Sequence, residues 1–225
     1  MTHSSGAASP SGSGLVRVWD LPTRIFHWLL AVLVVFSFVT AKVGGAWIQW
    51  HFYSGYTILS LVLFRLLWGF AGSHYARFAT FVRGPRAAVS YVRSRATVAG
   101  HNPLGALSVL AMLASLLVQG ATGLFATDDI VNEGPLMKLV SNSTAALLSR
   151  IHRANEKLLL VLVFLHLAAV LRYQLVRRRN LIGAMLTGDQ HLPEAVAAQD
   201  GPPTRLRAAL LAAIAAGLVA YVVNL

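Results

Sequence analysis

Five long apolar runs constrain this chain more than any other feature of its sequence. They extend over approximately residues 25–41, 52–70, 104–126, 157–176 and 206–221. A hydrocarbon core about 30 Å thick requires roughly 20 apolar residues in a helix, and each run meets or approaches that length. With 56% hydrophobic and 12% charged residues, the chain is also more apolar than one soluble core requires. The sequence therefore predicts an all-α integral membrane protein with five transmembrane helices.

The segments outside the runs predict the domain organisation. Residues 1–14 are rich in Ser, Gly and Ala and lack the features of a signal peptide, so we expect a disordered cytoplasmic tail. Residues 15–188 are expected to form a four-helix domain, residues 189–204 a linker, and residues 205–225 an additional transmembrane helix. That helix is expected either to lie beside the four-helix domain or to mediate assembly.

Basic residues between the runs predict the orientation in the membrane. Arginines are concentrated after the second run and at the end of the fourth: Arg77, Arg83, Arg86, Arg93, Arg95, Arg172, Arg177, Arg178 and Arg179. Because cytoplasmic loops are enriched in Lys and Arg, both regions and the N-terminus are expected to be cytoplasmic. Five spans then place Leu225 in the periplasm. The net charge of +11 is attributed to topology, since the sequence contains no nucleic-acid-binding motif.

The absence of cysteine limits the redox chemistry that is available to the chain. It excludes disulfides, iron–sulfur clusters held by thiolates, and haem attached covalently through a C-x-x-C-H segment. Any redox group must therefore be bound noncovalently.

Four of the eight histidines lie near the ends of the apolar runs: His27, His51, His152 and His166. His166 follows His152 by fourteen residues, which corresponds to about 21 Å of helix and to a difference of only roughly 40° in direction. The predicted topology pairs His51 with His152 near the periplasmic face and His27 with His166 near the cytoplasmic face. Neutral imidazoles can bind both sides of a haem iron, so the pairs predict two noncovalent b haems. For any single histidine, the alternative is a helix-end side chain that reaches the interface.

Other residues could support such sites. Arg65 lies at the depth of the inner pair, while Arg24 and Arg153 lie within one turn of a candidate ligand. Each arginine could bind a haem propionate or reach lipid phosphate. Gly55, like Gly120 and Gly123, could leave room for a macrocycle or could serve helix packing.

Several polar residues leave two interpretations open. His74 and His101 could compete for the inner site, but their polar surroundings favour solvated or interfacial roles. Gln119 could bond to a neighbouring helix or to a quinone. The acidic segment 128–133 could dock a basic partner or form a solvated loop.

Three stretches resemble one known family: VWDLPTRIFHWLL, HFYSGYTILSLVLFRLLWGFAGSHYARF and IHRANEKLLLVLVFLHLAAVLRY. They are similar to the bacterial cytochrome b561 and nickel–iron hydrogenase cytochrome b subunit family, over about residues 16–188. The resemblance implies a four-helix core in which histidines of the first, second and fourth spans bind two b haems. It carries those roles onto His27, His51, His152 and His166. The fifth span departs from the minimal four-helix pattern.

The resemblance also implies a function and a location. Members pass electrons between membrane quinone and partners such as a hydrogenase, a dehydrogenase or a c-type cytochrome, and they reside in the bacterial cytoplasmic membrane. We therefore expect a respiratory electron-transfer subunit that interacts with lipid and quinone and does not bind nucleic acid. The alternative is a non-redox membrane transporter or an assembly or anchor subunit.

Overall fold

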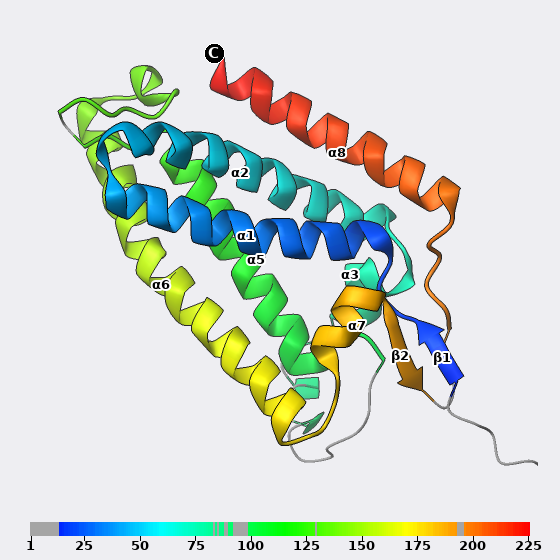
Figure 1. Cartoon of the computed structure of the whole chain (residues 1–225). Coiled ribbons are helices and arrows are strands. Elements are labelled where there is room, and N and C mark those ends of the chain that lie inside the picture. Colours follow the sequence, from blue (N-terminus) through cyan, green and yellow to red (C-terminus); the bar gives the residue numbers. More distant parts are fainter. Residues whose placement is uncertain are drawn as a thin grey trace, which may run out of the picture.

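The computed structural model of the chain describes residues 14–82, 84, 86–87, 90–91, 99–128, 130–192 and 196–225. The expected N-terminal tail lies outside the described residues except for Gly14, as do Arg83, Arg93, Arg95 and Asp129. Within the described residues, five helices are long and apolar enough to cross a membrane (Figure 1): α1 (Leu21–Val43), α2 (Ile48–Ala71), α5 (Pro103–Gly123), α6 (Asn142–Leu175) and α8 (Pro202–Val223). The prediction of an all-α multi-pass membrane protein is confirmed.

The helices pack in pairs. Helix α1 lies along α2, α5 lies along α6, and α2 joins the two pairs by contacting α5. Helix α6 makes no comparably close backbone approach to α1 or α2. Side chains bridge the space between α6 and the α1–α2 pair, as in the ion pair of Lys42 on α1 with Glu156 on α6 at 2.6 Å.

Helix α8 packs along α2 at the outside of the bundle (Figure 1). Ala208 and Ala215 of α8 are buried in the same apolar cluster as Phe64 and Trp68 of α2. Small side chains allow two helices to approach closely within a membrane. The fifth helix therefore covers α2.

Local sequence signals set the helix starts. The Asp20 side chain accepts a hydrogen bond from the Thr23 N–H at 2.6 Å, and a proline follows in the first turn of α1. Asn102 caps α5 in the same way, through the Gly105 N–H. These side chains satisfy backbone donors that the helix itself leaves free. The caps thereby fix where α5 and α1, the helix that carries His27, begin.

Helix α6 begins fifteen residues before the apolar run that predicted it. Ser141 caps its N-terminus and accepts a hydrogen bond from the Thr144 N–H. Charged residues between positions 150 and 157 lower the hydropathy of this segment, but they are good helix formers. The 34 residues of α6 extend for about 51 Å, so its first turns project beyond the hydrocarbon core. His152 consequently lies well inside the helix.

A small cap covers the arginine-rich end of the bundle. Strand β1 (Gly14–Arg17) pairs antiparallel with β2 (Asp189–Leu192), with Arg17 opposite Asp189, and the helix α7 (Leu181–Thr187) precedes β2. Val18 and Trp19 pack against residues of α7 and β2 in a separate apolar cluster. The sequence predicted no strand, and β2 falls within the segment expected to be a linker. The remaining elements are short: η1 (Gly45–Trp47), η2 (His74–Ala76), α3 (Phe78–Phe81) and η3 (Met137–Leu139).

Candidate functional site

The outer pair of histidines faces across the space between α2 and α6. The ring centroids of His51 and His152 lie 6.2 Å apart, with the planes at 88°. His51 Nδ1–H donates to the Ser37 carbonyl at 2.9 Å, and His152 Nδ1–H donates to the Gln119 carbonyl at 2.9 Å. Because a neutral imidazole has one N–H, Nε2 of each ring carries a lone pair. That of His152 accepts a hydrogen bond from the Gln119 side chain at 3.0 Å, which a metal at this position would displace. This is the arrangement by which an outer partner orients a metal-binding histidine.

The inner pair has nearly the same separation. The centroids of His27 on α1 and His166 on α6 lie 6.3 Å apart, with the planes at 53°. Nδ1 of His27 is buried and has no hydrogen-bond partner. Both pairs that the depth argument predicts are therefore brought together, although the backbone of α6 keeps its distance from α1 and α2.

The ring separations fit one metal ion between each pair of imidazoles. A coordinating nitrogen lies about 2 Å from its metal and about 1.1 Å from the centre of its own ring, so two opposed imidazoles have centroids about 6.2 Å apart. Among the described residues, no group of three or more His, Cys, Asp or Glu side chains could hold a metal ion. A metal ion that takes two ligands from the protein and its other ligands from a macrocycle fits this donor set.

A polar network positions the outer pair. Nε2 of Gln119 donates to Nε2 of His152 at 3.0 Å, and Oε1 of Gln119 accepts from Asn155 at 2.7 Å. Asn155 also bonds to the backbone and side chain of Ser115 on α5. Of the two interpretations of Gln119, the structure thus shows the bond to a neighbouring helix. Sequence reasoning missed Asn155, although a polar residue three positions after His152 was a usable signal.

Two glycines of α5 have different roles. A Cβ atom on Gly123 would lie 2.9 Å from Cε1 of His152, so this glycine admits the imidazole ring. A Cβ on Gly120 would lie 3.0 Å from a methyl group of Leu59, which indicates helix packing. A Cβ on Gly55 would meet no atom within 4 Å, so open space adjoins α2 one turn after His51.

Arg65 brings a buried positive charge to the inner end of the bundle. Its side chain belongs to a residue that is only 2% exposed, and its Nη1 atom has no hydrogen-bond partner. The guanidinium lies 5.2 Å from the ring centroid of Phe78. Asp20 attracts this charge but forms no ion pair with it, because the carboxylate already accepts bonds from Trp68 and Ser73. A buried arginine in this state requires an anion.

His101 lies in the same region and is half-buried rather than fully solvated. Its ring packs between Trp19 and Phe81, with centroid separations of 4.7 and 4.6 Å, and its Nδ1 atom is buried without a partner. Burial, followed by the nearby charges of Arg65, His166 and His27, lowers the pKa of His101 to about 3. The imidazole is therefore neutral, with an unused polar atom beside the inner pair.

The other two arginines are placed differently. Arg24 donates to the Leu186 carbonyl at 2.7 Å and lies 3.7 Å from Asp200, which ties α1 to the cap, although its Nε atom has no partner. Arg153 is exposed on α6, next to His152. His74 is half-buried and lines a surface pocket at the arginine-rich end.

Two histidine pairs at different depths of a membrane-spanning bundle are the arrangement of a transmembrane b-type cytochrome. The family model of prokaryotic cytochrome b561 matches residues 18–188, and the chain belongs to this family. The resemblance found in the sequence is thus confirmed. Membership implies noncovalent haem b and electron transfer within a membrane. Helix α8 lies beyond the matched residues.

The chain is also similar to curated proteins with one shared name. It is 24% identical over 209 residues to the probable Ni/Fe-hydrogenase B-type cytochrome subunits of Azotobacter chroococcum mcd 1 and Azotobacter vinelandii, covering 77% of this chain and 87% of each relative. A subunit of that name from Bradyrhizobium diazoefficiens is 21% identical over 217 residues, covering 80% and 87%. No solved structure matches the chain.

Proposed function

We propose that the protein binds two b haems, one between His51 and His152 and one between His27 and His166, and carries electrons across the membrane. The observation that carries this proposal is the pair of ring separations, 6.2 and 6.3 Å, at two depths of one helix. The fourteen residues between the two α6 histidines place the centres about 21 Å apart along the helix. Haem iron supplies one-electron chemistry when bound.

Residues around each pair have distinct roles in this proposal. At the outer site, the Ser37 and Gln119 carbonyls orient the imidazoles, and Gly55 leaves room for the edge of the macrocycle. At the inner site, Arg65 and neutral His101 would donate hydrogen bonds to the propionates through atoms that lack a partner in the protein. The protein contacts of Arg24 and the exposure of Arg153 favour structural and surface roles for these two arginines.

The redox partners are proposed from the names of the relatives and from the membrane setting. The names of the relatives support a hydrogenase as the partner, and a dehydrogenase or a c-type cytochrome would serve the same chemistry. Quinone is the proposed membrane carrier on the other side of the reaction.

The arginine-rich end is proposed to face the cytoplasm of a bacterial inner membrane, with Leu225 in the periplasm. A reporter enzyme that is active only in the periplasm, fused after Leu225, should be active in intact cells. Activity of the same reporter fused to the N-terminus instead would contradict this orientation.

Haem stoichiometry tests the assignment of the ligands. Purified wild-type protein should contain two haems per chain, while His152→Ala and His166→Ala should each lose about one, because a single remaining axial ligand binds haem weakly. Retention of the other haem in each variant reports that the bundle has folded. His191→Ala, which alters an exposed histidine of β2, is the matched control and should keep both haems. Wild-type protein without haem, or both variants with two haems, would refute the proposal.

A further inference from the structure

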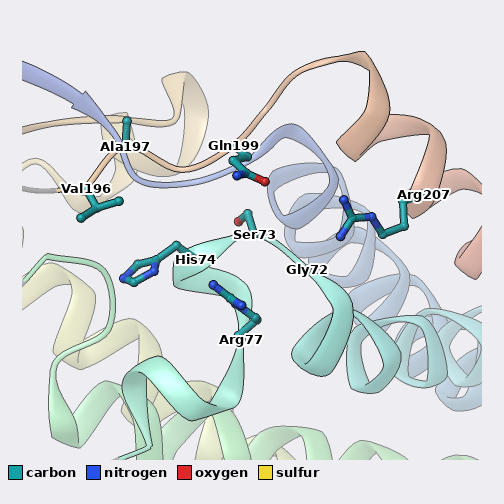
Figure 2. Close-up of a pocket in the computed structure, with 8 residues that line it drawn as sticks. All are labelled: Gly72, Ser73, His74, Arg77, Val196, Ala197, Gln199 and Arg207. Atoms are coloured by element: carbon teal, nitrogen blue, oxygen red, sulfur yellow. The ribbon is translucent and has the colours of Figure 1, made fainter.

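A polar pocket lies at the arginine-rich end, on the side of the bundle that α8 covers. Its volume is about 330 Å³, and it lies between the end of α2, the η2 turn and the segment of residues 196–199 that leads into α8. Figure 2 shows His74 and Arg77 on one wall, Gln199 on the opposite wall, and Arg207 extending from α8. The pocket is separate from both histidine pairs and is large enough for a small ligand or a headgroup.

The pocket is cationic and rich in hydrogen-bond donors. Arg207 donates to the Ala71 carbonyl at 3.0 Å, which uses one of the five N–H groups of its guanidinium. Among the described residues, no carboxylate forms an ion pair with Arg77 or Arg207. Two arginines with free donors that converge on one cavity suit a phosphate group, whose oxygens match the planar guanidinium.

The described carboxylates at this end are already used. Asp20 accepts bonds from Thr23, Trp68 and Ser73. Asp189 and Asp200 bind arginines of the cap and of the α8 start instead: Arg17, Arg24 and Arg205. These contacts leave the positive charge of the pocket without a described protein counter-ion.

The position of the pocket indicates the source of the phosphate. It lies where α2 leaves and α8 enters the apolar layer, which is the level of phospholipid headgroups. Exposed apolar side chains lie close in the sequence to the lining residues: Phe70, two positions before Gly72, is 77% exposed, and Leu206, next to Arg207, is 64% exposed. A cationic pocket adjoining exposed apolar surface suits a ligand that has an anionic head and acyl chains.

We propose that this pocket binds a phosphate group and that the headgroup of an anionic phospholipid supplies it. One lipid would then bridge α2 to α8, the helix that lies outside the family match. This inference does not depend on how many haems the protein binds.

The test measures lipid retention by native mass spectrometry of the full-length, delipidated protein in detergent. Phosphatidylglycerol should bind and zwitterionic phosphatidylcholine should not. The double variant Arg77→Gln with Arg207→Gln should weaken phosphatidylglycerol binding at least about tenfold, because two charged donors are lost from one site. The matched control is Arg172→Gln with Arg177→Gln, which removes the same charge from exposed positions at this end of α6 and should leave binding unchanged.

Three other outcomes would count against the proposal or against the lipid as the source of the phosphate. Equal binding of both lipids by the wild-type protein would overturn the proposal without requiring any variant. Equal losses in both double variants would also overturn it, since attraction would then be diffuse. If inorganic phosphate at equal concentration displaces phosphatidylglycerol from the wild-type protein, the phosphate chemistry is supported but the lipid source is wrong. An unchanged elution volume on size exclusion shows that the pocket variant is folded.

Discussion

The two histidine pairs differ in the environment of each ring. At the outer pair, backbone carbonyls of α1 and α5 hold Nδ1 of His51 and His152. At the inner pair, Nδ1 of His27 has no partner, while Arg65 and His101 present unused nitrogens nearby. Spacing along α6 predicted the depths of these side chains, because helix geometry is local. It could not predict their hydrogen-bond partners, which belong to other helices.

Gly123 provides a prediction at this scale. Gly123→Ala should shift the absorption and electron paramagnetic resonance signals of the proposed outer haem, because the added methyl group would lie 2.9 Å from His152 Cε1 and displace the ring. The inner haem should keep its signals. Gly217→Ala on α8, where a Cβ meets no atom within 4 Å, is the matched control. An unaltered outer haem in Gly123→Ala would show that the ring is not held against α5.

At the scale of elements, hydropathy located the membrane helices but not what surrounds them. Helix α6 starts at Asn142 because Ser141 caps it there and because the charged residues that follow, which a hydropathy criterion rejects, are good helix formers. The β1–β2 pair was not predicted, since its strands are four residues long and lie far apart in the sequence. Asp200 ties this cap together by accepting bonds from the Leu21 N–H, Arg17 and Arg205.

Asp200 should make the stability of the protein depend on pH. Burial raises the pKa of this carboxyl, but hydrogen bonds from Leu21, Arg205 and Arg17 outweigh burial and hold the pKa below its usual value. A carboxyl whose pKa is depressed by folding stabilises the fold above its unfolded pKa of about 3.9, and this contribution is lost as the pH falls through the folded value. Asp200→Ala should therefore lower the free energy of unfolding by about 2 kcal/mol at pH 7.

Denaturant unfolding of both proteins at several pH values measures this effect. The difference between the wild type and Asp200→Ala should persist at pH 5 and shrink below about pH 4. Glu133→Ala, in the exposed loop after α5, should cause little change at any pH. A difference that grows as the pH falls would contradict the assigned direction of the pKa shift.

At the scale of the whole molecule, the fold places two unlike sites within one bundle. His51 and His152 donate to carbonyls, which would increase the electron density that these imidazoles provide to a metal in the proposed outer site. The inner site lies near the buried charge of Arg65, which favours the reduced form of a bound haem. The inner haem should therefore have the higher reduction potential.

A redox titration of the wild type and two variants tests this order. A unit charge about 10 Å from a haem iron changes the free energy of reduction by about 1–2 kcal/mol at an effective dielectric constant near 20. This corresponds to a shift of roughly 40–90 mV in the reduction potential for one electron. Arg65→Gln keeps a hydrogen-bond donor and should lower the inner potential by an amount in that range. Arg153→Gln, which removes an exposed charge beside His152, should shift the outer potential much less because solvent screens it. Identical shifts in the two variants would exclude a special role for the buried charge.

The sequence by itself determined the five membrane helices, the family and the depths of the four histidines. Each of these follows from local hydropathy, from the fixed rise of a helix or from matching residue patterns. Only the tertiary structure decided that Nδ1 of His101 is buried near Arg65, that α8 covers α2, and that Arg17 binds Asp189. Arg17 and Asp189 are separated by 172 positions in the sequence. Such contacts depend on the path of the whole chain, which no local pattern encodes.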